Sequence, residues 1–304
     1  MRNFDLSQIE TLDDVPRSHW VAIGNKLGGV GVVVAILRGK KSVKVEDAVK
    51  LLFDRHGRRI PEGLQANVCD ANRSFRLDQP KLEAAVDYAN RIMRLHGCLG
   101  VDTEVTAEQF KAETERLLAL IRDNSQIANI AKGFWLPVVM PRLTTDDLGT
   151  GLEQYLRGVG KSYAETSERS FCNHHQGALA GAVSVVAGSR HERLVKRLKQ
   201  GPVMGIHFPS PLQGFSVDAS RKQMSTLPEG FILSGLDTSI AMAMYPDILA
   251  RDFNTPGLDL AAFGWQSADY SLDFRAYDGE LGFGSTGDLA GASGSYSGGL
   301  LFLG

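Results

Sequence analysis

The densest group of side chains suited to chemistry is formed by Cys172, His174 and His175. A thiolate and two imidazoles are good zinc ligands, but a zinc site needs three or four ligands, which usually come from two paired motifs. The sequence holds no second pair, and His191 and His207 could complete a site only if the fold brought them there. We therefore predict a surface loop with a hydrogen-bonded histidine, and neither a metal nor a cofactor.

Two aspartate–arginine pairs could act as acid–base or anion-binding groups: Asp70 with Arg73, and Asp218 with Arg221. Together with His174 they define the site of an alternative hypothesis, an enzyme of unknown reaction. An aspartate three residues before an arginine is more typical of a turn or helix start with a local ion pair, which contributes little to stability. The sequence contains neither a Gly-x-Ser-x-Gly nor a His-Glu-x-x-His motif. We therefore predict no catalytic residue.

A glycine cluster that includes a lysine, at residues 24–31, invites comparison with phosphate-binding loops. Such a loop follows a strand and opens a helix, whereas this cluster precedes an apolar run from Gly28 to Leu37. The run is rich in β-branched residues and about half as long as a membrane span. We predict a turn at the cluster and a buried strand at Gly28–Leu37.

Length and composition set the broad class of the protein. At 304 residues the chain exceeds the usual size of a single core, and we predict an N-terminal α/β domain at 1–140 and a C-terminal α+β ligand-binding domain at 141–304. The net charge of −2 argues against nucleic acid or a membrane as partner. Three widely spaced cysteines, and a start without the apolar core of a signal peptide, predict a reduced, cytoplasmic protein.

Hydrophobic periodicity predicts several helices and an overall α+β fold. One helix is expected from an Asp78 cap to Gly97, and a longer one from Thr106 toward Ile130. Further helices are expected around 152–163 and 190–200. The stretch 134–141 contains two prolines and is predicted to be an extended connection or an edge strand.

Two segments of the chain resemble each other. Residues 60–73 align without gaps on residues 208–221, with Pro, Leu-Gln, Asp-Ala and Arg in common. A repeat period near half the chain length favours two related domains over a solenoid, whose repeats are much shorter. An internal duplication is one hypothesis, and coincidence in a chain rich in Gly, Ala and Val is the other.

The last forty residues, 265–304, differ most from ordinary globular sequence. Residues 270–274 alternate as a strand does, and Asp278-Gly279 is a typical hairpin turn leading into a second alternating segment at 280–284. After a loop rich in Gly and Ser, the apolar segment 299–303 is predicted to be a buried closing strand.

This order of Trp-x-Ser, a Tyr-x-Leu-x-Phe strand, a Gly/Ser/Tyr-rich loop and a closing strand resembles the C-terminal end of C-type-lectin-fold proteins. It is most similar to the formylglycine-generating-enzyme-like group that includes the variable proteins of diversity-generating retroelements. The usual arginine-containing ending of that group is replaced here by Leu-Leu-Phe-Leu at 300–303. The resemblance implies a lectin-like region at 205–304 whose ligand-contacting positions are variable. The ligand-binding residues expected here are Trp265, Gln266, Asp269, Tyr270, Tyr277, Asp278, Glu280, Ser285, Asp288, Ser293, Ser295 and Tyr296.

Tyrosine, serine, glycine and aspartate also make up antibody binding loops, in which tyrosine supplies rigid contact area and the small polar residues adapt their hydrogen bonds. The expected function is therefore non-enzymatic binding of a protein or small-molecule ligand. A further alternative is a structural or assembly protein whose tail contacts a second copy in a homo-oligomer. A flexible surface hairpin without a partner would have the same composition.

Overall fold

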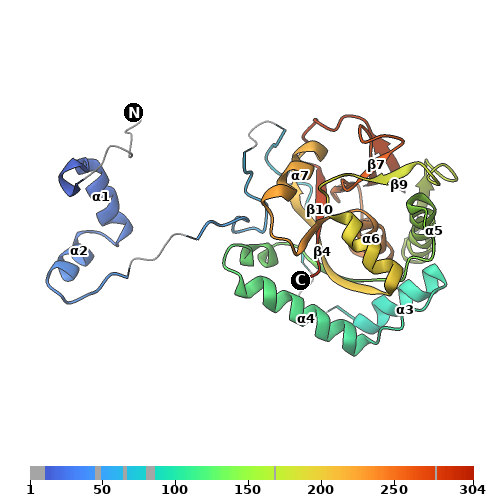
Figure 1. Ribbon diagram of the computed structural model, residues 1–304, viewed down its shortest axis with the longest axis horizontal. Helices are drawn as coiled ribbons and strands as arrows, with labels where there is room; N and C mark the ends of the chain where they lie inside the picture. The colour runs from blue at the N-terminus through green and yellow to red at the C-terminus, as the bar shows by residue number, and fades with distance from the viewer. Residues whose placement is uncertain (1–10, 45–48, 64–66, 80–85, 168, 278) are drawn as a thin grey trace. The chain divides into compact units, whose positions relative to one another are not determined.

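The computed structural model describes residues 11–44, 49–63, 67–79, 86–167, 169–277 and 279–304 (Figure 1). The chain divides into two compact units, residues 1–49 and residues 50–304, which are described separately. The domain boundary that the sequence predicts between residues 140 and 141 falls inside the second unit.

The first unit contains a short 3-10 helix, η2 (Leu12–Asp14), and two α-helices, α1 (Arg17–Lys26) and α2 (Val30–Leu37). The prediction of a buried strand at Gly28–Leu37 is wrong, because its main part forms α2, and no residue of α1 or α2 is buried. An unbroken apolar run has neither a period of 2 nor one of 3.6, so periodicity alone could not separate strand from helix. The expected turn is present, since Gly28 and Gly29 both have positive φ, at 105° and 86°.

Within the described ranges, no single helix is long and apolar enough to cross a membrane. Helices α1 and α2 meet the length and composition criteria only when taken together, and they are bent by 90° with respect to each other.

The second unit is built on a mixed sheet in the order β1-β4-β10-β6-β8-β9-β2, with β5 also paired to β10. Two of its pairings are parallel, β10 with β6 and β2 with β9, and the others are antiparallel. A small second sheet pairs β3 with β7. The strands are β1 (Leu136–Met140), β2 (Ser170–Asn173), β3 (Val183–Val185), β4 (Val203–Gln213), β5 (Phe231–Leu233), β6 (Gly257–Leu260), β7 (Phe263–Trp265), β8 (Ser271–Ala276), β9 (Glu280–Thr286) and β10 (Tyr296–Phe302).

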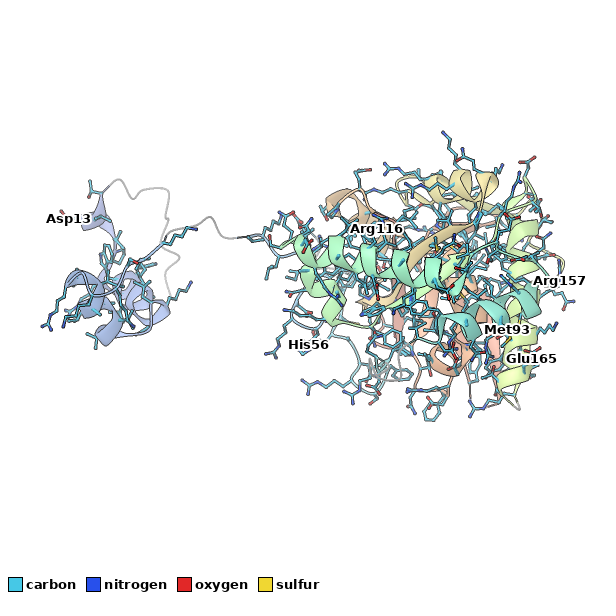
Figure 2. All side chains as sticks on the ribbon, turned by 90° about the horizontal axis from the view of Figure 1, so that it is seen from below. Asp13, His56, Met93, Arg116, Arg157 and Glu165 are labelled. Carbon is cyan, nitrogen blue, oxygen red and sulfur yellow. The ribbon has the colours of Figure 1, made fainter. Side chains whose placement is uncertain are left out.

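Helices surround this sheet, and the α+β fold class predicted from the sequence is confirmed. Helices α3 and α4 lie side by side along one border of the unit (Figure 1), and Met93 and Arg116 project from them toward solvent (Figure 2). The helices are α3 (Tyr88–Leu99), α4 (Ala107–Asp123), η4 (Ala128–Lys132), α5 (Leu148–Thr166), α6 (His191–Gln200), α7 (Val217–Gln223), η5 (Met224–Thr226), α8 (Leu236–Met244) and α9 (Pro246–Leu249).

Local signals indicated four of these helices, α3, α4, α5 and α6, and missed α7, α8 and α9. Thr106 and Gln109 form the capping box that starts α4, and α6 ends at Gln200 immediately before Gly201. Helix α3 is capped by Asp87, nine residues after the expected cap at Asp78, and residues 80–85 between them lie outside the described part of the chain.

The core lies between the sheet and helices α5 and α8. Every residue of α8 is buried, which explains why an amphipathic period is absent from that segment. Ser162 of α5 donates to the carbonyl oxygen of Ala243 at 2.6 Å, and the Tyr245 hydroxyl donates to that of Pro137 at 2.8 Å. These bonds tie α8 and its C-terminal end to both α5 and β1.

The two segments that resemble each other in sequence do not share secondary structure. Residues 208–221 form the end of β4 and most of α7, whereas the described residues of 60–73 contain no helix and only an isolated bridge, from Val68 to Phe215. The segments contact each other through two backbone hydrogen bonds. The Cys69 N–H donates to the carbonyl oxygen of Gly214 at 2.8 Å, and the Ser216 N–H donates to that of Asn67 at 2.9 Å. The duplication hypothesis therefore gains no structural support.

Candidate functional site

The C-terminal hairpin is formed by β8 and β9, which pair in register with Phe274 opposite Phe283. Their phenylalanine rings lie 4.8 Å apart at the centroids and are buried, which fixes the hairpin on the core. The expected hairpin is present, although Asp278 of its turn lies outside the described residues.

The expected closing strand is also present, as β10 in the middle of the sheet. Its glycines allow other side chains to approach closely. A Cβ atom on Gly299 would lie 2.8 Å from Ser234 Oγ, and one on Gly298 would lie 2.8 Å from Ser220 Oγ.

A cavity of about 360 Å³ opens over the hairpin. Gly282 and Gly284 of β9 leave this part of the strand without side chains, so His174 can lie above it, with ring atoms 3.7 and 3.9 Å from where their Cβ atoms would be. The cavity is lined by His174, His175, Asp273, Arg275, Tyr277, Gly282, Gly284, Ser285 and Thr286.

Arg275 is held at this cavity by two tyrosine rings. Its guanidinium carbon lies 4.8 Å from the centre of the Tyr296 ring and 5.6 Å from that of Tyr277. Among the described residues, no carboxylate forms an ion pair with it and no acceptor receives its N–H groups. Cation–π contacts therefore position this cation and leave its hydrogen-bond donors available.

An aromatic cluster adjoins the cavity. The His175 ring packs against Trp265 with centroids 4.1 Å apart and the ring planes tilted by 41°, and Tyr270 meets Trp265 edge-on at 6.1 Å. Burial, and secondarily the charge of His174, lowers the pKa of His175, so this imidazole is neutral at neutral pH. Among the described residues, the buried atoms His175 Nε2, Trp265 Nε1 and Tyr296 Oη have no hydrogen-bond partner.

Two buried aspartates lie beneath these groups. Asp259 of β6 and Asp273 of β8 are direct cross-strand partners and are only 5% and 8% exposed. Burial and then the charge of Asp273 raise the pKa of Asp259 well above its usual range, against the opposing effect of Arg275 and Arg221. Burial likewise raises the pKa of Asp273, again opposed by Arg275. In the described part of the chain neither carboxyl group accepts a hydrogen bond, which is unusual for buried acids.

The structure brings some of the expected binding residues together and leaves others apart. Trp265 contacts Tyr270, both Tyr277 and Tyr296 contact Arg275, and Ser285 lines the cavity.

The other expected residues serve mainly to shape the loops. Gln266 has a left-handed backbone conformation, and its backbone N–H donates to the carbonyl oxygen of Ala182 at 2.7 Å. The Asp269 carboxylate accepts from the Ser267 hydroxyl at 3.4 Å. Glu280 begins β9 opposite Ser170, Asp288 accepts from the Gly291 amide, and the Ser293 and Ser295 hydroxyls bond to each other.

Sequence reasoning missed Asp259, Asp273 and Arg275 as site residues. A signal existed for two of them, because strand alternation places Asp273 and Arg275 on the same face of β8. No local signal links Asp259 to them, since that contact depends on sheet order.

The alternative enzyme site is not assembled. Arg221 donates to the carbonyl oxygens of Ala261, Phe263 and Ala268 at 2.8 to 3.0 Å, and so holds the loop around β7. Asp70 is exposed and lies 3.8 Å from a different arginine, Arg58. No hydrogen bond or ion pair among the described residues joins Asp70, Arg73, Asp218, Arg221 or His174 to one another.

A buried serine–histidine–aspartate group, Ser234, His207 and Asp237, resembles a catalytic triad only in composition. The Ser234 hydroxyl and His207 Nδ1 both bind Asp237 Oδ2, at 2.7 and 2.8 Å, whereas a nucleophilic serine must bond the other imidazole nitrogen. All three residues are fully buried. Although burial opposes ionisation, the hydrogen bond and charge of His207 hold the pKa of Asp237 below its usual range. We interpret this group as a structural core network.

The expected cysteine–histidine loop occupies β2 and the turn after it. Cys172 Sγ lies 3.7 Å from His174 Nδ1, and across the described ranges no three Cys, His, Asp or Glu side chains are grouped to hold a metal ion.

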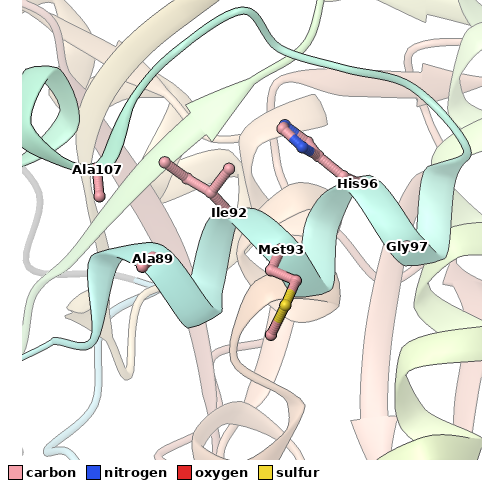
Figure 3. A pocket seen from close by; sticks show the side chains of 6 residues that line it. All are labelled: Ala89, Ile92, Met93, His96, Gly97 and Ala107. Carbon is pink, nitrogen blue, oxygen red and sulfur yellow. The ribbon is translucent and has the colours of Figure 1, made fainter.

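A larger hollow, of about 590 Å³, lies on α3 (Figure 3). His96 and Ile92 extend from one side of the helix and Met93 from the other. His96 Nε2 already receives the Thr103 amide at 3.0 Å, so the hollow presents few free polar groups.

The chain matches no protein-family model, no curated protein and no solved structure.

Proposed function

We propose that this protein is a non-enzymatic binding protein that recognises a partner protein through its C-terminal hairpin. The contact surface, called here the hairpin face, consists of Trp265, Tyr270, Arg275, Tyr277 and Tyr296 around the cavity. The observation that carries the proposal is the Arg275 guanidinium, held between two tyrosine rings without an acceptor among the described residues.

The aromatic residues of the hairpin face have the properties of binding hot spots. Tyr270 and Tyr277 are 44% and 40% exposed, yet each is in contact with a neighbouring side chain that limits its motion. Little conformational entropy is lost when such side chains are covered, and tyrosine, tryptophan and arginine dominate measured hot spots. The resemblance of residues 265–304 to variable lectin-fold proteins supports the same assignment.

The chemistry of the cavity favours an acidic group of the partner. A guanidinium with free N–H donors binds a carboxylate through two parallel hydrogen bonds. A glutamate or aspartate side chain of a partner protein, seated against Arg275 and flanked by the tyrosines, satisfies these groups.

The proposal is tested with an array of short peptides whose central residue is acidic, neutral or basic. We expect retention of peptides with acidic centres, and a loss of about tenfold or more in affinity on Arg275→Gln, since a charge-assisted hydrogen bond contributes about 1.5–3 kcal/mol. Arg122→Gln, an exposed arginine on α4, is the matched control and should bind as the wild type does. Equal retention of all three peptide classes, or of acidic peptides by Arg275→Gln, would refute the proposal.

A genomic observation tests the resemblance separately. A reverse-transcriptase gene beside this gene, with a near-copy of the segment encoding residues 265–304, is expected if the hairpin face is variable. Its absence would leave a fixed binding surface and would contradict the variable one.

A further inference from the structure

Helices α1 and α2 of the first unit carry several exposed apolar side chains. Val30 is 81% and Leu37 80% exposed, and neither helix has a buried residue. The sequence of α2, Val-Gly-Val-Val-Val-Ala-Ile-Leu, has no polar side chain at all. The helices meet closely at Gly24, where a Cβ would lie 3.7 Å from Val33 Cγ2. Val32, Val33 and Val34 are half-buried, but Val21, Val30 and Leu37 stay exposed. An exposed apolar surface of this kind marks an interaction site.

The charge of the same segment is strongly asymmetric. Although the whole chain has a net charge of −2, residues 17–44 contain no Asp or Glu. Positive charges stand at both ends of α1 and in the segment that follows α2. The basic residues of 17–44 are Arg17, Lys26, Arg38, Lys40, Lys41 and Lys44.

An apolar helix pair bordered by basic residues is complementary to an anionic lipid surface. Lys and Arg near the ends of apolar helices extend their charged groups toward lipid headgroups while their methylene stems stay in apolar surroundings. Trp20, which is 42% exposed on α1, is of the residue type that prefers the membrane–water interface. A second copy of the chain would cover the valines but would bring the same positive charges together.

The helix lengths indicate how deep such an insertion would go. At about 1.5 Å per residue, the ten residues of α1 and the eight of α2 extend about 15 and 12 Å, roughly half of the 30 Å hydrocarbon core. The 90° bend between them excludes a straight span. The pair can therefore enter one leaflet with its basic residues among the headgroups.

We propose that residues 17–44 bind the protein to anionic lipid bilayers by inserting α1 and α2 into one leaflet. The whole-chain charge, which argued against a membrane partner, does not describe residues 17–44, which carry six Lys and Arg and no Asp or Glu. The inference is independent of the hairpin face.

The test uses the full chain and vesicles of phosphatidylcholine, with and without about 30% phosphatidylserine. We expect co-flotation with the anionic vesicles that weakens as salt is raised. Replacing Lys26, Lys40 and Lys41 by Gln should weaken it about 100-fold, because each basic residue near an anionic surface contributes about fivefold. The matched control replaces three exposed lysines of the second unit, Lys132, Lys196 and Lys222, and should bind as the wild type does.

Insertion is checked by tryptophan fluorescence with lipids brominated in the acyl chain. We expect quenching of the full chain that is lost in Trp20→Phe, and loss of vesicle binding in the variant Val30→Asp/Leu37→Asp. Because two aspartates in α2 can also unfold the helix, the lysine variant, which keeps the apolar sequence intact, decides the outcome. The proposal is overturned if neither vesicle type binds the chain, or if light scattering shows self-association without lipid that Val30→Asp/Leu37→Asp abolishes.

Discussion

Replacing Asp259 by Asn should stabilise the protein at neutral pH, the opposite of what most buried substitutions do. Asp259 faces Asp273 across the β6–β8 pair, and both carboxyl groups are almost fully buried. The pKa of Asp259 is raised by burial and by Asp273, so these costs outweigh the attraction of Arg275 and Arg221. The Asp259–Asp273 pair therefore lowers the stability of the folded wild type, whether the two carboxyl groups share a proton or are both charged.

The size of the effect follows from the strand register. Directly opposed residues of an antiparallel pair have Cβ atoms about 5 Å apart. Two full charges at that separation repel by about 3 kcal/mol at an effective dielectric constant of about 20. Because Arg275 and Arg221 offset part of this repulsion, we expect Asp259→Asn to raise the free energy of unfolding by about 1–2 kcal/mol near pH 7.

The raised pKa of Asp259 also determines how the stability of the protein changes with pH. The folded-state pKa of Asp259 lies above its unfolded value of about 3.9, so the unfolded chain gives up the proton first as pH rises. The folded state consequently loses stability between about pH 4 and the folded pKa. Asp259→Asn removes most of this loss, so its advantage over the wild type should be small near pH 4 and grow with pH.

The assay is urea unfolding followed by circular dichroism at several pH values. A matched control is Asp237→Asn, a second buried aspartate whose pKa is held low by His207. That change breaks a buried pair and should destabilise by about 3 kcal/mol or more. If Asp259→Asn is less stable than the wild type at pH 7, or keeps its pH slope, the repulsion argument is wrong.

Three further outcomes are expected. Tyr277→Ala should weaken binding of acidic peptides by about tenfold, since hot-spot truncations cost more than about 1 kcal/mol. Phe253→Ala, which removes an aromatic ring that is more exposed than Tyr277, should not change it. Affinity for acidic peptides should rise as pH falls, because protonation of Asp259 and Asp273 removes negative charge near the Arg275 guanidinium. Titration calorimetry measures this affinity, and an unchanged value from about pH 8 to about pH 5 would contradict the expectation. Gly299→Ala should lower the free energy of unfolding by about 1–3 kcal/mol, because the new methyl group would lie too close to the buried Ser234 hydroxyl. An unchanged free energy of unfolding in urea would disprove that close packing.

The structure contradicts one sequence-based prediction and gives no support to another hypothesis. The valine run at 30–37 was assigned to a strand because β-branched residues favour sheets, yet two left-handed glycines begin a helix there. The similarity of 60–73 to 208–221, for which duplication and coincidence were both open, is not matched by secondary structure, because one segment belongs to β4 and α7 and the other does not.

The sequence alone determined the features that depend on neighbouring residues. Thr106 with Gln109 started α4, Gly201 ended α6, and alternation marked the β8–β9 hairpin and the buried closing strand, because capping and periodicity act within a few residues. Only the tertiary structure placed Asp259 against Asp273 and set Arg275 between Tyr277 and Tyr296. Arg275 and Tyr277 are only two residues apart, but the contacts of Asp259 with Asp273 and of Arg275 with Tyr296 depend on which strands are neighbours in the sheet and in what register, and no local pattern in the chain encodes either.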